Sequence, residues 1–142
     1  MAARALSQND LPKYLFARGF RKSEYLYGLH AVATSRGPIV VVEGATDVWR
    51  LGRNAVGLFG NSISKKQIEL LIIHARARPI IVLLDRGMEN QAGQIASKIE
   101  SARRLQGDTA SVKVAEIPAD YEDPGDCPRD LLWQHLASLQ LA

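Results

Sequence analysis

Three short apolar runs divide the middle of the chain, and each is followed by a turn and then by an amphipathic segment. The runs cover residues 39–42, 55–59 and 80–84, and none of them contains a polar side chain. A strand that is buried on both faces has this composition, and such strands belong to parallel sheets. A fourth segment, residues 111–117, alternates between apolar and polar positions and predicts a strand at the edge of the sheet.

The segments that follow these runs predict helices. Thr46 is expected to cap a helix that carries Val48 and Leu51. Ser64 begins another helix with a capping box, because Gln67 stands three residues further along. Two longer stripes have the spacing of helices packed on a sheet. Their apolar members are Ile68, Leu71, Ile72 and Ala75 in the first stripe, and Ala92, Ile95, Ala96, Ile99 and Ala102 in the second.

The two ends of the chain complete the pattern. Pro128 opens a last helix, whose apolar residues are Leu131, Leu132, Leu136 and Leu139. Before the break at Gly37-Pro38, a short helix is predicted with Tyr25, Leu26, Leu29 and Ala33 on one face. The resulting order β-α-β-α-β-α-β-α predicts an α/β, Rossmann-like domain, with a four-stranded, mainly parallel sheet and helices on both faces.

Composition limits the class of protein. A length of 142 residues fits one core, although residues 1–36 are interpreted as a separate basic segment and residues 37–142 as the domain. No apolar run approaches the length of about 18 residues that a membrane span needs. The first residues lack the apolar core of a signal peptide, and the single cysteine, Cys127, cannot form an internal disulfide or a cysteine-rich zinc site. A reducing, cytoplasmic setting is therefore expected.

Charge is unevenly distributed, although the net charge is only +3. Residues 1–36 carry six basic side chains against two acidic ones, whereas residues 116–130 carry six acidic side chains against Arg129. A basic end suits phosphates and an acidic cluster suits a metal ion. Two solvated surface regions explain the same distribution.

Acidic residues follow the ends of three predicted strands. Glu43 closes the first strand, Asp85 closes the third, and Asp123 and Asp126 follow the fourth. In an open parallel sheet, ligands bind outside the carboxyl ends of the strands. Asp47 lies one helical turn past Glu43 and is expected to face the same crevice. Taken singly, each acid is explained as a cap or turn residue; taken together, they predict a site for Mg²⁺ or Mn²⁺.

Four motifs stand in a fixed order along the chain. Glu43-Gly44-Ala45-Thr46-Asp47 follows the first apolar run and resembles the E-G-x-x-D motif of the Toprim catalytic domain of bacterial DnaG-type DNA primases. Another is the Leu26-Tyr27-Gly28-Leu29 segment upstream. Leu84-Asp85 with Ala92-Gly93 resembles the D-x-D-x-A-G motif. Ile117-Pro118 with Asp123-Pro124-Gly125-Asp126 resembles the L-P…D-P-D segment. The similarity runs from about residue 12 to residue 133, and Gly19-Phe20-Arg21-Lys22-Ser23 also belongs to it.

The resemblance implies roles for particular residues. Glu43 would act as the general acid/base or the acid beside the metal, and Asp85 would ligate Mg²⁺ or Mn²⁺ directly. Asp123 and Asp126 would complete the metal-binding edge, with Asp47 as a further candidate ligand. Arg21 and Lys22 would contact nucleotide or template phosphate. Lys65 and Lys66 are interpreted as a solvated helix face or as further phosphate contacts.

One departure from the family pattern affects the predicted metal site. Gly87 stands where the second acid of D-x-D belongs, in a loop that is longer than the family's loop. Either Glu89 or Asn90 supplies the missing oxygen, or the site is weakened and Arg86 occupies the space of the cation. The chain also contains none of the zinc-binding or helicase-binding domains of primases, which are therefore possible partners.

Three functions are consistent with these observations. The first is Mg²⁺-dependent nucleotidyl transfer in RNA primer synthesis, with DNA, RNA and nucleotides as partners. The second is a Toprim nuclease, and the third is a catalytically degenerate module that binds nucleic acid or a replication partner. Trp49 and Trp133, which lie near the acidic motifs, are interpreted as packing residues or as base-stacking residues.

Overall fold

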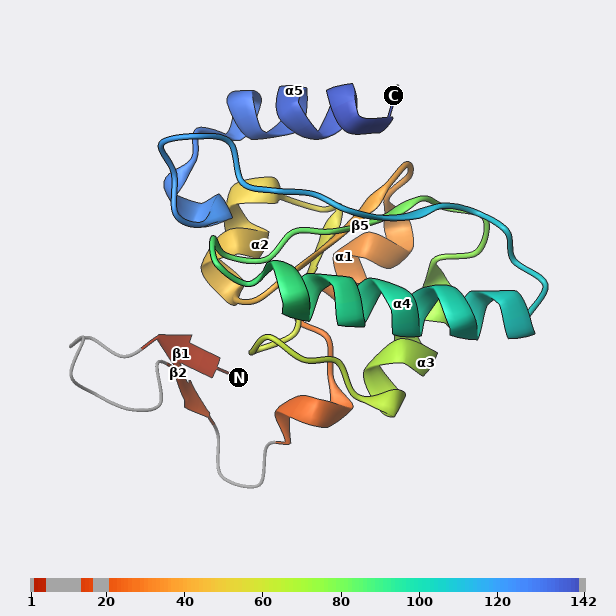
Figure 1. Ribbon diagram of the computed structural model, residues 1–142. Helices are drawn as coiled ribbons and strands as arrows, with labels where there is room; N and C mark the ends of the chain where they lie inside the picture. The colour runs from red at the N-terminus through yellow and green to blue at the C-terminus, as the bar shows by residue number, and fades with distance from the viewer. Residues whose placement is uncertain (1, 5–13, 17–20, 141–142) are drawn as a thin grey trace.

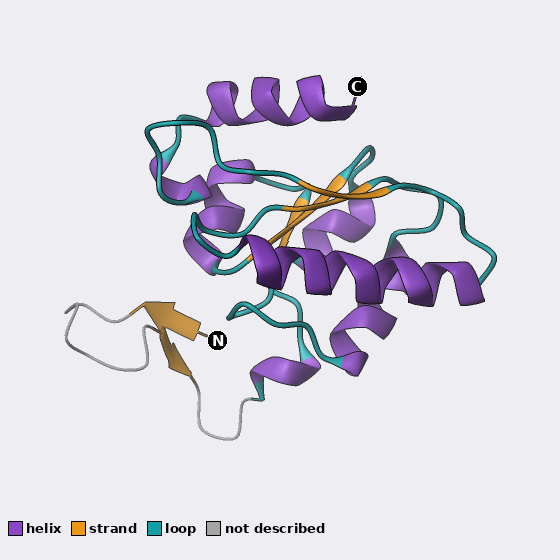
Figure 2. Ribbon diagram, viewed as in Figure 1, coloured by secondary structure: helices purple, strands orange, loops and turns teal. Residues whose placement is uncertain are grey.

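A four-stranded sheet forms the centre of the domain (Figures 1 and 2). The computed structural model describes residues 2–4, 14–16 and 21–140. The strands lie in the order β4-β3-β5-β6, and all three pairings are parallel. Their bounds are β3 (Ile39–Val42), β4 (Ala55–Gly57), β5 (Ile80–Val82) and β6 (Val112–Val114). The predicted α/β class and the edge position of the last strand are confirmed, and the sheet is entirely parallel.

Over residues 21–140, five α-helices and two short 3-10 helices connect or follow the strands. The α-helices are α1 (Leu29–Thr34), α2 (Ala45–Leu51), α3 (Lys65–His74), α4 (Glu89–Leu105) and α5 (Arg129–Gln140). The 3-10 helices are η1 (Lys22–Glu24) and η2 (Pro124–Asp126). None of the helices in the described part of the chain is long and apolar enough to cross a membrane.

The predicted basic segment is only partly described. Within it, β1 (Ala2–Arg4) and β2 (Tyr14–Phe16) form a separate antiparallel pair, which the sequence pattern did not predict. Lys13 and Arg18, together with Gly19-Phe20 of the primase-like motif, lie outside the described residues. Arg21 and Lys22 are described and are both exposed.

The alternating side chains of β3 divide the core between the two faces of the sheet. Ile39 and Val41 pack in one cluster with α1, α3 and α4, so these three helices cover the same face of the sheet. Val40 and Val42 pack in the other cluster with α2 and α5. All four side chains are fully buried. Both faces are therefore covered, as a parallel sheet requires.

Two helices begin at residues that differ from the predicted ones. α2 is capped by Gly44 rather than by Thr46, and the Asp47 carboxylate accepts the Gly44 N–H at 3.2 Å. α1 begins only at Leu29, because Gly28 before it has a φ of 83° and lies against the Ala55 carbonyl. A Cβ at Gly28 would approach that oxygen to 2.8 Å, so the close contact of the two segments requires glycine.

Four predicted inward positions face solvent instead. In α1, Ala33 is exposed, and Val32 is the buried residue. Tyr25 precedes α1 and is 51% exposed, whereas its neighbour Leu26 is buried. Leu131 is exposed because α5 turns Leu132 and Leu136 toward the sheet, one helical turn apart. Val114 is exposed because β6 pairs on one side only.

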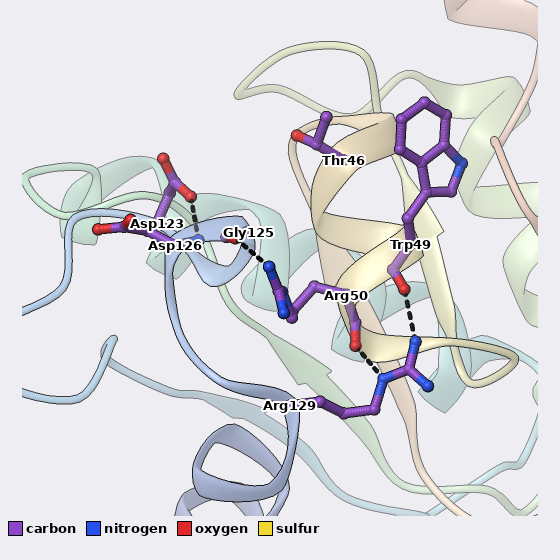
Figure 3. Close-up of a pocket in the computed structure, with 7 residues that line it drawn as sticks. All are labelled: Thr46, Trp49, Arg50, Asp123, Gly125, Asp126 and Arg129. Atoms are coloured by element: carbon purple, nitrogen blue, oxygen red, sulfur yellow. Dashed lines mark hydrogen bonds between the residues drawn. The ribbon is translucent and has the colours of Figure 1, made fainter.

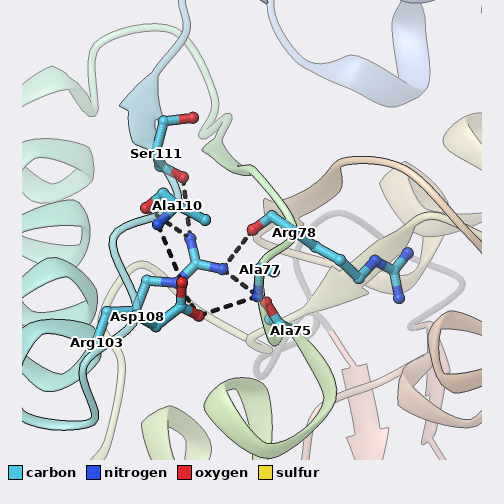
Figure 4. Close-up of polar contacts among 7 residues, drawn as sticks. All are labelled: Ala75, Ala77, Arg78, Arg103, Asp108, Ala110 and Ser111. Carbon is cyan, nitrogen blue, oxygen red and sulfur yellow. Dashed lines mark hydrogen bonds and ion pairs between the residues drawn. The ribbon is translucent and has the colours of Figure 1, made fainter.

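A buried arginine joins the ends of three elements on the side of α3 and α4 (Figure 4). The Arg103 side chain is only 1% exposed and forms an ion pair with Asp108 at 3.3 Å. Its guanidinium also donates to the carbonyls of Ala75, Arg78, Ala110 and Ser111. One cation thus bonds carbonyls in the α3–β5 connection and in the segment before β6, and two of these, the Ala75 and Ser111 carbonyls, also accept a backbone N–H.

Replacing Arg103 with methionine should destabilise the domain strongly. Arg103→Met retains an apolar stem but removes the buried cation that pairs with Asp108 and donates to four carbonyls, so the free energy of unfolding should fall by about 3 kcal/mol or more. Urea denaturation followed by circular dichroism measures this change. Arg104→Met, at an exposed neighbour paired only with Glu100, should cost less than about 0.5 kcal/mol. Equal effects of the two substitutions would contradict the role assigned to Arg103.

Low pH should destabilise the cluster around Arg103 by protonating Asp108. The Ala110 backbone N–H lowers the pKa of this carboxyl, helped by the Ala77 N–H and the Arg103 guanidinium, and partial burial opposes them. A carboxyl whose pKa is lower in the folded state stabilises the fold above the pKa of the unfolded state, about 4, and loses that contribution as the pH falls. We expect Asp108→Asn to flatten the acid limb of the stability–pH curve, measured by urea midpoints, and an unchanged limb would refute this.

Candidate functional site

Glu43 and Asp85 meet at the carboxyl edge of the sheet because their strands are neighbours. Glu43 directly follows β3, and Asp85 follows the continuation of β5, whose Leu83 N–H still bonds the Val41 carbonyl of β3. The Glu43 Oε1 atom accepts the Asp85 backbone N–H at 3.2 Å. Both side chains are half-buried. The structure therefore brings together the two residues that the resemblance assigns to catalysis.

Asp47 lies beneath this edge rather than facing an open crevice. Its side chain is only 5% exposed. One carboxylate oxygen accepts the Gly44 N–H and the other accepts the Gly125 N–H at 3.0 Å. Asp47 therefore ties the start of α2 to η2, and this role accounts for an acid at position 47.

Asp123 and Asp126 belong to the 3-10 turn that Asp47 holds. The Asp123 side chain accepts the Asp126 backbone N–H at 2.9 Å and so caps η2. Gly125 lies between Asp123 and Asp126 in the sequence and packs against Asp47 and Asp123. A Cβ at Gly125 would be 3.2 Å from a carboxylate oxygen of each of these two acids.

The loop that carries Gly87 is a tight turn. The Met88 N–H bonds the Asp85 carbonyl at 3.1 Å, and Gly87 has a φ of 90°, a conformation that L side chains rarely adopt. Glu89 turns back, and its Oε1 atom accepts the Gly87 N–H at 3.3 Å. The Glu89 carboxylate, which was predicted as one source of the missing oxygen, thus contacts the backbone of its own loop at the start of α4.

Arg86 points away from the space between the acids. Its guanidinium donates to the carbonyls of Ile117, Pro118 and Tyr121, and its backbone N–H bonds the Glu122 carbonyl. The prediction that Arg86 replaces the cation is wrong, because its side chain instead fastens the β5–α4 loop to the segment that leads into η2.

The acids present fit a metal ion only in part. Among residues 2–4, 14–16 and 21–140, no three His, Cys, Asp or Glu side chains are close enough together to hold a metal ion. Glu43 and Asp85 remain as a pair from neighbouring strands. Mg²⁺ is often bound by one or two carboxylates together with substrate phosphates. The pair therefore suits a cation whose remaining ligands come from a bound phosphate, and does not form a site by itself.

Lys22 reaches the same edge from the other side. A Cβ at Gly60 would lie 3.7 Å from the Lys22 Nζ atom, and the Gly60 N–H bonds the Glu43 carbonyl at 3.3 Å. Lys65 and Lys66 are exposed in the first turn of α3, which packs on η1. The structure thus places an ammonium group beside Gly60, whose N–H bonds the Glu43 carbonyl, and more positive charge on the neighbouring helix.

Gln67 holds the segment that carries Lys22. Its side chain is buried, and its amide nitrogen lies within hydrogen-bonding distance of the Lys22, Tyr25 and Leu58 carbonyls, at 3.0, 2.9 and 3.2 Å. The predicted capping box with Ser64 is also present. The capping pattern in the sequence identified Gln67, but it gave no signal for the contacts to η1, which lies more than 40 residues earlier.

A polar cleft of about 580 Å³ adjoins the acidic edge (Figure 3). Thr46, Trp49 and Arg50 of α2 line one side, and Asp123, Asp126 and Arg129 line the other. Arg50 crosses to the Gly125 carbonyl, and Arg129 donates to the carbonyls of Trp49 and Arg50. The sequence pattern gave no indication of these arginine contacts, because they join residues about 75 to 80 positions apart.

Comparison with solved structures identifies primase catalytic cores. The zinc-binding and RNA polymerase domains of the Aquifex aeolicus primase match with a TM-score of 0.74 and 24% identity, covering 96% of this chain and 36% of that chain. A DnaG primase catalytic domain bound to ssDNA matches at 0.72 and 26%, with 96% and 46% covered. A DNA primase domain from Pseudomonas aeruginosa matches at 0.72 and 27%, with 96% and 45% covered. No protein-family model matches the chain, and no curated protein matches it.

The fold is therefore that of a Toprim domain, with its acids at the carboxyl edge of a parallel sheet. Within this class, the chain is similar to the catalytic cores of DnaG-type DNA primases over nearly its whole length. It spans less than half the length of each of these primase structures.

Removing the Gln67 amide should loosen η1 without unfolding the sheet. Gln67→Leu keeps the side-chain volume but leaves buried carbonyls without a donor, which should lower the free energy of unfolding by about 1–3 kcal/mol. Amide hydrogen exchange at Glu24 and Tyr25, whose N–H groups bond within this segment, should accelerate more than exchange in β3. Gln94→Leu, at an exposed position of α4, should change neither. Uniform acceleration throughout the domain would contradict this local role.

Proposed function

We propose that this Toprim domain acts in primase-type nucleotidyl transfer on nucleic acid. Glu43 and Asp85 would bind Mg²⁺ or Mn²⁺ jointly with phosphate oxygens of the substrate. The observation that carries the proposal is the pairing of these two acids at the ends of adjacent strands, with Glu43 Oε1 at 3.2 Å from Asp85 N. A divalent cation at such a pair neutralises phosphate charge and activates an oxygen nucleophile.

The charges around the edge support nucleic acid as the substrate. Lys22 lies beside Gly60 at the same edge, and Lys65 and Lys66 extend the positive surface along α3. Lysine side chains bind phosphates as point charges, which does not require a particular base sequence. Among the similar structures, a DnaG primase catalytic domain is bound to ssDNA, and we extend this ligand class to the present chain. Zinc-binding and helicase-binding domains remain proposed partners.

A second candidate function is a binding module without catalysis. It is favoured by Gly87, which stands where the second acid of D-x-D belongs. Asp47 and Asp123 accept backbone N–H groups and help to hold η2 in place, so part of the acidic cluster has a structural role. A module of this kind would bind nucleic acid without a divalent cation, with an affinity that falls steeply with salt.

The experiment compares metal binding and primer synthesis in the wild type, Glu43→Gln and Asp85→Asn. Calorimetric titration with Mn²⁺, with and without a single-stranded template and nucleoside triphosphates, should detect binding that requires the phosphates. Either substitution should abolish this binding and reduce primer synthesis by about 100-fold or more. Glu69→Gln, which removes an exposed acid of α3, is the matched control and should leave both unchanged.

The other outcomes separate the alternatives. Degradation of the template in metal without triphosphates would assign nuclease activity to the same pair of acids. Template binding that survives chelation of the metal, without synthesis or cleavage, would support the binding module. A chain that binds neither metal nor nucleic acid would overturn both proposals.

A further inference from the structure

Trp49 is a large aromatic side chain that α2 exposes beside the acidic edge. Its side chain is 59% exposed, although a tryptophan of a folded domain is usually well buried. It lines the cleft of about 580 Å³, a volume within the range of small-molecule sites. Figure 3 shows the indole at one end of this cleft, Asp123 and Asp126 at the other, and Arg50 between them.

The indole is held in one orientation. Its Nε1–H donates to the Tyr27 hydroxyl at 2.7 Å, and the Tyr27 ring meets it edge to face with centroids 6.5 Å apart. Tyr27 is itself fixed by two backbone hydrogen bonds with Gly57 and by an edge contact with Phe59. Because the ring is already oriented, little side-chain entropy would be lost when a flat ligand stacks on it.

The backbone under Trp49 is equally constrained. Arg129 donates to the Trp49 and Arg50 carbonyls at 2.7 and 2.6 Å, and the Trp133 indole donates to the Leu51 carbonyl at 3.1 Å. These contacts fix the last turn of α2. The Arg50 side chain is exposed and, within the described residues, makes one hydrogen bond, from its Nη2 atom to the Gly125 carbonyl. Its remaining N–H groups are available to an anion.

We infer that Trp49 is a stacking platform for a nucleobase, and that Arg50 binds the phosphate of the same nucleotide. A rigid exposed indole, a neighbouring guanidinium and a polar cleft provide the two chemistries that single-stranded nucleic acid requires. The walls formed by Thr46, Arg50 and Arg129 are polar, which does not suit an apolar protein partner. This inference rests on the proposed nucleic-acid function and adds a second contact region, outside the Glu43–Asp85 pair.

Equilibrium binding to single strands tests the platform. Wild type, Trp49→Phe and Trp49→Ala are titrated against a labelled oligothymidylate of about 12 nucleotides and against the same strand with abasic sites. Stacking on one base should make Trp49→Ala about tenfold to hundredfold weaker on the normal strand, with Trp49→Phe intermediate. On the abasic strand, wild type and Trp49→Ala should bind equally.

Salt dependence, a control variant and a titration with ATP separate base stacking from other contributions to binding. The salt dependence of binding should have the same slope in wild type and Trp49→Ala, because no phosphate contact is removed, whereas Arg50→Gln should reduce it by about one phosphate contact. Leu105→Ala removes another exposed apolar side chain, at the far end of α4, and should have no effect. A parallel titration with ATP distinguishes a free nucleotide from a strand as the source of the base.

The failures can be told apart. If the wild type and Trp49→Ala bind the strand equally well, the stacking platform is refuted and the proposed function stands. The exposed indole would then be assigned to contact with a protein partner. If Trp49→Ala weakens both strands equally, the effect does not come from the base and the inference also fails. If the wild type binds neither the strand nor ATP, the proposed function fails, and this inference fails with it.

Discussion

The parallel pairing of β3 with β5 is the constraint on which the rest of this domain depends. Because each strand is pleated, consecutive β3 side chains lie on opposite faces of the paired sheet, with α1, α3 and α4 covering one side and α2 and α5 covering the other. The same pairing brings the ends of two strands together and sets Glu43 against the Asp85 backbone. The core and the candidate site are therefore consequences of a single strand register.

Hydrogen bonds hold three irregular segments against the sheet and its helices. In each case a single buried polar side chain makes the contacts. Arg103 joins the α3–β5 connection to the segment before β6, Gln67 holds η1, and Asp47 holds η2. Each of these three side chains is buried. Lys22 belongs to η1, and Asp123 caps η2. The arrangement of charge around the candidate site therefore depends on buried side chains that hold these two segments in place.

The frame could be predicted from sequence because it follows from local periodicity. The apolar runs at residues 39–42 and 80–84 and the capping box at Ser64 are local signals, and each corresponds to an element in the structure. Contacts between distant segments have no such signal, which is why the buried roles of Gln67 and Arg103 were not predicted. Family motifs located the acids, but the direction of the Arg86 side chain depends on carbonyls more than 30 residues away.

The positive φ of Gly87 limits how this loop could change during evolution. In the structure, the backbone at position 87 has a φ of 90°, where any residue with a Cβ is strained. A single substitution to aspartate would therefore add a carboxylate at the expense of the turn between Asp85 and Met88. An acid at this position would therefore require residues 85–89 to change shape together, and one substitution would not be enough.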